Sequence, residues 1–322
     1  MTGVYRFASL IAASLVVLSV AGCAAGMDRS QSQRQTTPLA KHDLESTEFF
    51  DGFTPAKLRA VDPCALLRSS GIEEYGVPAS DTPGEIGSCS NFMKDHNGKS
   101  FNVSLYMRSD AFEVSEHRIG GLPASISADG NPCFVQVAYQ GSKGMLSSPQ
   151  AMQLQLDSAE AADPCSPAVQ IMTRVVEQLR ANPPIANRSP AELAGIDPCA
   201  MLDPVAARDA LGGTTADPEP RGLHECGWAA ANGVSVDLQF STGEPQPSAL
   251  PPADLGGRLA SVVPNSGLSS CSAQWEHRRR PGTINGIELV QLTVYNQNKI
   301  PMDPCANAVN AARGVKAKLP PA

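Results

Sequence analysis

The sequence is poor in aromatic residues and in charge, and it lacks the short motifs of common enzyme classes. Aromatic residues make up 5% of the 322 residues and charged residues 18%, beside 27 glycines and 27 prolines. This composition predicts modest hydrophobic cores that need covalent support. The net charge of −7 argues against nucleic acid as a partner.

Catalytic and metal-binding patterns are also missing. There is no GxSxG, HExxH or phosphate-loop motif, and the five histidines are scattered at positions 42, 96, 117, 224 and 277. No two cysteines lie within five residues of each other, so the chain has no CxxC clip of the kind used by zinc sites. We therefore expect no metal, no cofactor and no enzymatic activity.

The N-terminus contains a short apolar segment preceded by one positive charge. Arg6 precedes an uncharged, mostly apolar run from Phe7 to Val20, which is too short for a typical spanning helix and suits a signal peptide. The run ends on Val20-Ala21-Gly22-Cys23, which resembles a bacterial lipobox. The resemblance implies cleavage after residue 22, a diacylglyceryl thioether on Cys23 and acylation of the new N-terminus, for instance with palmitate. We expect attachment to the extracytoplasmic face of the cell membrane through this anchor.

Eight cysteines remain in the exported chain, and their spacing shows a repeat. The steps are 25, 44 and 32 residues from Cys64, and 27, 45 and 34 residues from Cys199. GSCSNF at 87–92 matches HECGWA at 224–229 in register. The chain therefore contains a tandem repeat of a unit of about 120 residues, and each copy has the usual size of a domain.

The tripeptide Asp-Pro-Cys opens and closes each unit, at residues 62–64, 163–165, 197–199 and 303–305. Aspartate is a strong helix N-cap and proline suits the first helical position. Cysteine then falls in the first turn, so the motif predicts a helix start that is tethered covalently to another element. A reactive cysteine at a helix N-terminus is the alternative interpretation.

The pattern between these helix starts is that of strands. Apolar residues alternate over 101–107 and 234–240, and two further alternating segments follow the third cysteine of each unit. The closing motif precedes an amphipathic helix in both units. The sequence predicts an α+β fold of two similar tandem domains, each an antiparallel sheet with helices on one face, stapled by disulfides.

The expected boundaries follow from these segments. Residues 1–22 are the signal peptide, and residues 23–58 a flexible tether. The first cysteine-rich domain spans 59–182, a proline-rich linker 183–191, and the second domain 192–322.

Four cysteines in each unit allow three disulfide connectivities. Because the third cysteine opens one strand of a hairpin, the partner strand returns to the same edge just before the closing motif. This geometry favours Cys133–Cys165 and Cys271–Cys305. Shorter loops and elimination then favour Cys64–Cys89 and Cys199–Cys226.

The lipobox, the DPC-x-L-L/M opening, the paired cysteines and the closing DPC helix together resemble the actinobacterial lipoproteins catalogued as domain of unknown function 3558. The resemblance covers nearly all of the mature chain, as two copies. It implies no activity and no functional residue beyond Cys23 and the cysteine framework.

Two local features of the sequence are candidate sites. His224 stands beside Glu225, but the other unit has Gly87-Ser88 there, so we expect a surface histidine. Arg278, Arg279 and Arg280 form the one concentrated basic patch, which either is a solvated loop or contacts anionic lipid or an anionic envelope polymer.

The sequence favours a non-enzymatic binding or scaffold module of the cell envelope, whose partner is an unidentified protein, lipid or polymer. The alternative is a carrier of a hydrophobic ligand in a pocket between sheet and helices. A hydrolase assembled from scattered residues is a third hypothesis.

Overall fold

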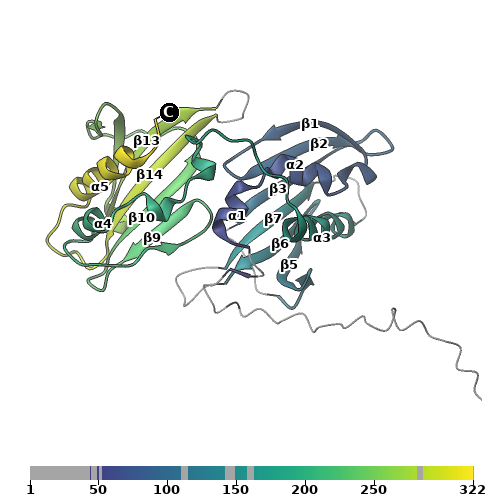
Figure 1. Cartoon of the computed structure of the whole chain (residues 1–322), viewed down its shortest axis with the longest axis horizontal. Helices are drawn as coiled ribbons and strands as arrows, with labels where there is room; N and C mark the ends of the chain where they lie inside the picture. The colour runs from purple at the N-terminus through teal and green to yellow at the C-terminus, as the bar shows by residue number, and fades with distance from the viewer. Residues whose placement is uncertain are drawn as a thin grey trace, which may run out of the picture. The chain divides into compact units, whose positions relative to one another are not determined.

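The computed structural model describes residues 44, 49–50, 53–109, 115–141, 149–157, 163–280 and 286–321. Residues 41–322 form one compact unit, in which the described residues build two seven-stranded antiparallel sheets. The predicted α+β class with two similar, disulfide-stapled sheet domains is confirmed (Figure 1).

The two sheets have the same strand order. From edge to edge, the first is β1 (Val77–Pro83), β2 (Ser88–Lys94), β3 (Ser100–Ser109), β7 (Gln150–Asp157), β6 (Pro132–Gln140), β5 (Leu122–Ala128) and β4 (Arg118–Ile119). The second is β8 (Glu219–Pro220), β9 (Glu225–Ala229), β10 (Val234–Thr242), β14 (Ile287–Asn296), β13 (Ser270–Arg279), β12 (Leu259–Asn265) and β11 (Ala253–Asp254). Each strand of one repeat therefore has a counterpart in the other.

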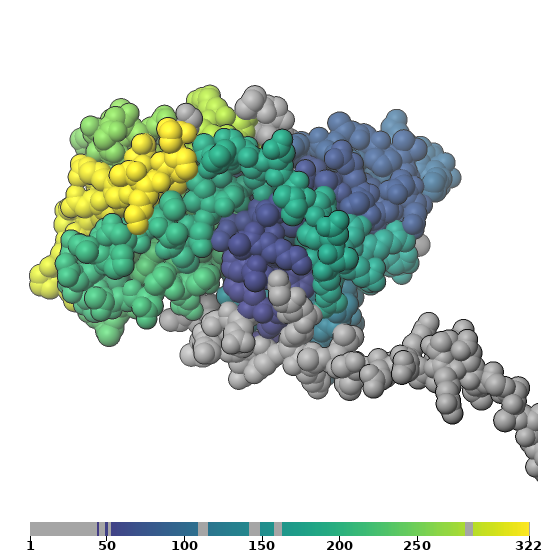
Figure 2. All heavy atoms as spheres, in the orientation of Figure 1, coloured from purple at the N-terminus to yellow at the C-terminus, as the bar shows by residue number. Residues whose placement is uncertain are grey.

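Helices flank the strands at both ends of each repeat. The α-helices are α1 (Pro55–Ala60), α2 (Pro63–Ser69), α3 (Cys165–Ala181), α4 (Pro204–Ala210) and α5 (Pro304–Lys318). The 3₁₀ turns are η2 (Ile72–Glu74), η3 (Leu193–Gly195), η4 (Pro198–Ala200) and η5 (Ser266–Leu268). Helices α2 and α3 contact the first sheet and α5 contacts β12 to β14 of the second. The outer side of α5 lies at the molecular surface (Figure 2).

Alternation along the strands makes the core. On β10, Val234, Val236, Leu238 and Phe240 are buried while the residues between them are partly exposed. The buried side packs against α4 and α5 because successive side chains of a strand point to opposite faces. Strands β6, β13 and β14 are buried more completely, with buried side chains on both faces over much of their length.

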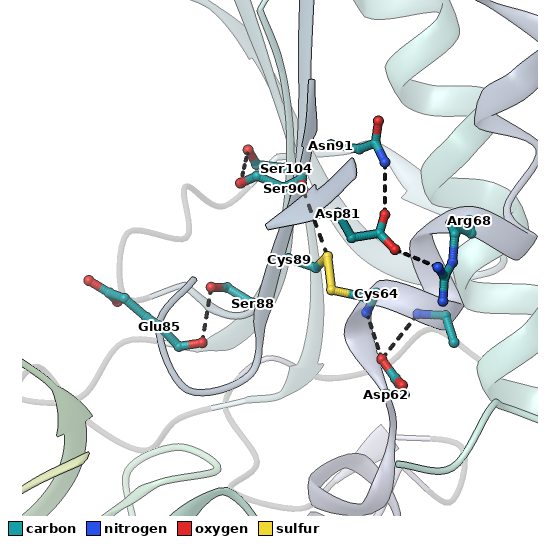
Figure 3. Close-up of a disulfide and its surroundings, with 11 residues drawn as sticks. Asp62, Cys64, Arg68, Asp81, Glu85, Ser88, Cys89, Ser90, Asn91 and Ser104 are labelled. Atoms are coloured by element: carbon teal, nitrogen blue, oxygen red, sulfur yellow. Dashed lines mark hydrogen bonds and ion pairs between the residues drawn. A yellow bond between two sulfur atoms is a disulfide. The ribbon is translucent and has the colours of Figure 1, made fainter. Parts of the chain in front are cut away.

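Three of the Asp-Pro-Cys motifs start α-helices, as predicted, and the one at 197–199 starts the 3₁₀ turn η4. The carboxylates of Asp62, Asp163, Asp197 and Asp303 accept from the cysteine N–H two residues on, at 2.9, 3.0, 3.1 and 2.9 Å. Figure 3 shows the first motif, with Asp62 bonded to the helix start and Cys64 joined to Cys89 of β2.

The disulfides have the predicted connectivity. Their Cα–Cα distances are 5.1 Å for Cys64–Cys89, 5.2 Å for Cys133–Cys165, 5.1 Å for Cys199–Cys226 and 4.9 Å for Cys271–Cys305. Each bond ties a helix start to a strand of the same repeat. Four disulfides indicate an oxidising, extracytoplasmic environment.

The predicted tether is wrong at its C-terminal end. Residues 53–58 are not a flexible segment, because α1 begins at Pro55 behind the N-cap Thr54. Phe53 and Leu58 are 1% and 2% exposed and belong to the core of the first repeat. The proline-rich linker is also bonded to the first repeat, because Ile185 forms a β-bridge with Val61.

The two repeats exchange one apolar side chain each. Ile86 of the first repeat packs in the core cluster of the second, and Leu223 of the second packs in that of the first. Each stands three positions before the second cysteine of its repeat, Cys89 or Cys226. The loops before β2 and β9 therefore make equivalent contacts.

Among the helices within the described ranges, none combines the length and the apolar character that a membrane crossing requires.

Candidate functional site

A cavity of about 180 Å³ lies where the equivalent loops and strand ends of the two repeats come together. Its polar wall includes Ser88, Tyr106 and Arg108 from the first repeat, and His224, Gln239 and Ser241 from the second. Its volume is slightly larger than that of an engineered apolar cavity of about 150 Å³ that accommodates benzene. The cavity is therefore large enough for a small organic molecule.

Equivalent backbone positions line both sides of the cavity. The register pairs Ser88 with Tyr106 across β2 and β3, and Glu225 with Gln239 across β9 and β10. The Met107 N–H donates to the Gly87 carbonyl, and the Phe240 N–H donates to the His224 carbonyl, both at 2.9 Å.

The side chains at these equivalent positions differ. Gly87 of the first repeat corresponds to His224 of the second, and Arg108 corresponds to Ser241. Gly87 has a φ of +76°, and a Cβ added there would lie 3.4 Å from His224 Nε2. Because Gly87 has no side chain, the imidazole of the other repeat can lie against its backbone.

His224 is not a surface histidine, contrary to the prediction from sequence. Its side chain is 4% exposed, because it packs on Gly87 at the contact between the repeats. Its Nδ1 atom is buried and has no hydrogen-bond partner in the described part of the chain. Such groups are uncommon in protein interiors.

Burial, together with the charges of Arg59, Arg188 and Arg108, lowers the pKa of His224 to about 3. The imidazole is therefore neutral at physiological pH. The three positive charges add to the effect of burial, since each disfavours protonation of the ring.

The three guanidinium groups are held in different ways. Arg108 Nη2 lies 2.6 Å from Glu225 Oε2, and Arg59 Nη2 lies 3.3 Å from Oδ2 of the half-exposed Asp197. Arg188 donates to the carbonyls of Arg59 and Val61. Burial lowers the pKa of both Arg59 and Arg188, although nearby carboxylates partly oppose this effect.

The surroundings of His224 differ from those of the histidine in an acyl-transfer triad. In a Ser–His–Asp triad the histidine Nδ1–H donates to a carboxylate that orients the ring, whereas Nδ1 of His224 has no partner among the described residues. A base with a pKa near 3 is also far from the value that suits proton transfer at neutral pH. The wall is partly polar, so it is not the apolar sheet–helix pocket of the carrier hypothesis.

The residues of the predicted basic patch lie at the end of β13 and just after it. Arg278 Nε is 3.0 Å from Oε2 of Glu288, Arg280 Nε is 3.9 Å from Oε1, and Glu288 is 1% exposed. Arg279 is 74% exposed and pairs with Glu276. Contact with an anionic surface stays a prediction, with Arg279 the most accessible of the three.

The other predicted site residues are either disulfide-bonded or outside the described residues. Cys23, the expected lipidation site, and the signal peptide lie outside them. Within the described ranges there is no group of three or more side chains placed to hold a metal ion.

The cavity itself was missed from sequence. It joins residues more than 100 positions apart, and the mismatch between Gly87 and His224 predicts no site when each repeat is considered separately. The useful signal was that same mismatch, since a glycine in one repeat leaves room for a large side chain from the other.

Comparisons of the sequence and the structure with known proteins do not assign the chain to a family. No protein-family model matches the chain, and no curated protein matches it significantly. One solved structure, DynU16 from the dynemicin biosynthetic locus, aligns over 81% of this chain and 90% of its own, with 10% identity and a TM-score of 0.15.

Proposed function

We propose that the protein is a lipid-anchored, extracytoplasmic binding protein of the cell envelope, without enzymatic activity, whose ligand occupies the cavity that Gly87 and His224 help to line. The observation that carries the proposal is the buried, unpaired His224 in a cavity whose lining differs between the two repeats. Ligand sites are typically concave and combine apolar lining with a few placed polar groups, and here the two repeats supply different side chains to one such cavity.

The ligand can be sought directly. Native mass spectrometry of the protein extracted from its own membranes is expected to show an additional bound mass, which Ser241→Phe abolishes by filling the cavity. Ser235→Phe is the matched control, because Ser235 lies on the same strand and face and does not line the cavity. Equal loss in both variants, or no bound mass in the wild type, would contradict a ligand site here.

The anchoring is a separate part of the proposal. It rests on the lipobox at 20–23 and on the resemblance to the actinobacterial lipoprotein family catalogued as domain of unknown function 3558. Cys23→Ala is expected to leave the precursor uncleaved, and to remove the acyl-dependent partition into detergent. A variant that still matures and partitions as the wild type does would show that Cys23 is not the anchor.

A further inference from the structure

We propose, resting on the proposed function, that this cavity binds a neutral sugar ring, either a free monosaccharide or one unit of a glycan chain. The volume of about 180 Å³ exceeds the roughly 150 Å³ of a cavity that accommodates benzene, so it admits one six-membered ring with its hydroxyl groups. A lipid chain or a peptide segment of several residues would not fit within this volume.

The wall carries hydrogen-bonding groups that the fold does not use. Tyr106, Gln239 and Ser241 line the cavity, and within the described ranges none of these side chains has a hydrogen-bond partner. All three are partly exposed, so a ligand can reach them from solvent. A phenol, an amide and a hydroxyl can each donate and accept hydrogen bonds. The complementary ligand therefore has several groups that also do both, and hydroxyl groups meet this requirement.

The charges on the wall are paired or screened, which favours an uncharged ligand. Arg108 Nη2 lies 2.6 Å from Glu225 Oε2, and the buried ring of His224 is neutral at physiological pH. Glu85 also lines the cavity, but it is exposed, so water screens its charge. A cation would gain only this exposed carboxylate, which contributes little. An anion would lose its hydration without gaining an unpaired positive group on the wall.

The same cavity offers apolar surface for the ring itself. Met107 and Phe240, each 2% exposed, belong to its wall. A sugar ring carries C–H groups on its faces and hydroxyl groups around its edge, so one small ligand can make both kinds of contact. A purely apolar ring would displace water from the hydroxyl and amide groups and leave them unpaired, which is costly.

Hydrogen-bonding side chains continue from the cavity onto both sheets. Tyr106 is the register partner of Gln153, and Gln239 is the register partner of Gln291, so each pair lies side by side on one face of its sheet. Gln153 and Gln291 are partly exposed, and each accepts from a further glutamine on the neighbouring strand. A second sugar unit beside the cavity would therefore meet amide groups. We expect a short glycan to bind more tightly than a single sugar.

Saturation-transfer NMR titrations on the full, oxidised chain test the class of ligand, because they detect weak binding. The probes are glucose, galactose, mannose, arabinose and N-acetylglucosamine, a linear trisaccharide of each, the phosphorylated form of each monosaccharide, and benzyl alcohol as an apolar ring. We expect at least one neutral sugar to bind, and its phosphorylated form to bind more than about tenfold more weakly, since the wall offers its charge no partner.

Two variants test the contacts. Gln239→Leu and Tyr106→Phe should each weaken binding of the neutral sugar about tenfold, because each removes a hydrogen bond to the ligand. Gln155→Leu is the matched control and should preserve binding, because Gln155 is also a partly exposed glutamine within a strand and does not line the cavity. Should Gln239→Leu fail to fold, Tyr106→Phe removes only one oxygen atom and gives the same information.

The outcomes distinguish the source of the sugar and separate this inference from the proposed function. Tighter binding of the trisaccharide identifies a glycan, and equal binding identifies a free monosaccharide. Absence of binding by every neutral sugar, equal or tighter binding of the phosphorylated form or of benzyl alcohol, or unchanged binding in both variants would overturn the inference. A bound mass in the native spectrum that is not a carbohydrate would then leave the proposed function standing, whereas absence of any bound mass would contradict both.

Discussion

At the residue scale, the contact between Gly87 and His224 shows how a duplicated unit acquires asymmetry. One repeat keeps a glycine with a positive φ, and the other places an imidazole against it. The substitution of one side chain therefore creates a feature that neither repeat has alone. The cost is a neutral, buried ring with an unpaired nitrogen.

This cost predicts a pH dependence of stability. The pKa of His224 is lowered from 6.5 to about 3 on folding, so between these values the unfolded chain binds a proton that the folded chain does not. The free energy of unfolding therefore falls by about 1 kcal/mol for each pH unit as the pH decreases from 6.5 toward 3. Above pH 6.5 the imidazole is neutral in both states and causes no loss. We expect His224→Gln to flatten the decline of the unfolding free energy between pH 6.5 and 4.

Guanidinium denaturation at pH 7, 6, 5 and 4 measures this decline. His96→Gln is the control, because His96 is exposed and should leave the profile unchanged. The pKa of His277 is also lowered, chiefly by burial, so part of the slope should persist in His224→Gln. Identical profiles for the wild type and His224→Gln would contradict the assignment.

At the element scale, the aspartate of each Asp-Pro-Cys motif acts as a helix cap independently of the disulfide. The Asp303 carboxylate accepts from the N–H groups of Cys305 and Ala306 at the start of α5. Asp303→Ala should lower the unfolding free energy by about 1 kcal/mol, and Asp303→Asn should lower it much less, because asparagine also caps. Denaturation of the oxidised proteins measures the difference, and equal losses in both variants would show that capping is not the role of Asp303.

The elements that could be predicted from sequence are those fixed by local chemistry. The capping motif determines where α2 and α5 begin, and alternation over 234–240 determines β10, so both were predicted correctly. Strand β1 was missed because its residues are mostly exposed or half-buried and do not alternate. Strands β4, β8 and β11 have two residues each, which is too short for any periodicity.

The candidate site depended on tertiary contacts and was not predicted. Nothing in the sequence around His224 indicates burial, because the group that covers it, Gly87, belongs to the other repeat. The same is true of Leu58 in α1 and of Phe53 just before its N-cap, which gain their partners only from the folded first repeat.

At the scale of the whole molecule, the exchange of Ile86 and Leu223 couples the stability of the two repeats. Leu223 belongs to the second repeat by sequence and to the core of the first by packing. Leu223→Ala should cost about 2–5 kcal/mol and should reduce hydrogen-exchange protection in β3 and β7 of the first repeat. Leu211→Ala, at an equally buried residue of the second core, should instead affect β10 and β14. Loss of protection confined to β10 and β14 in Leu223→Ala would show that the contact carries little energy.

The reciprocal placement of Ile86 and Leu223 also bears on how many copies such a chain can contain. Each repeat offers one apolar side chain and receives one, so a pair satisfies both in the manner of an isologous dimer. Solenoid repeats stack head to tail, and their terminal units need caps. In the arrangement seen here two repeats satisfy each other's contacts. The equivalent isoleucine or leucine of a third copy would have no core to enter and would be exposed to water.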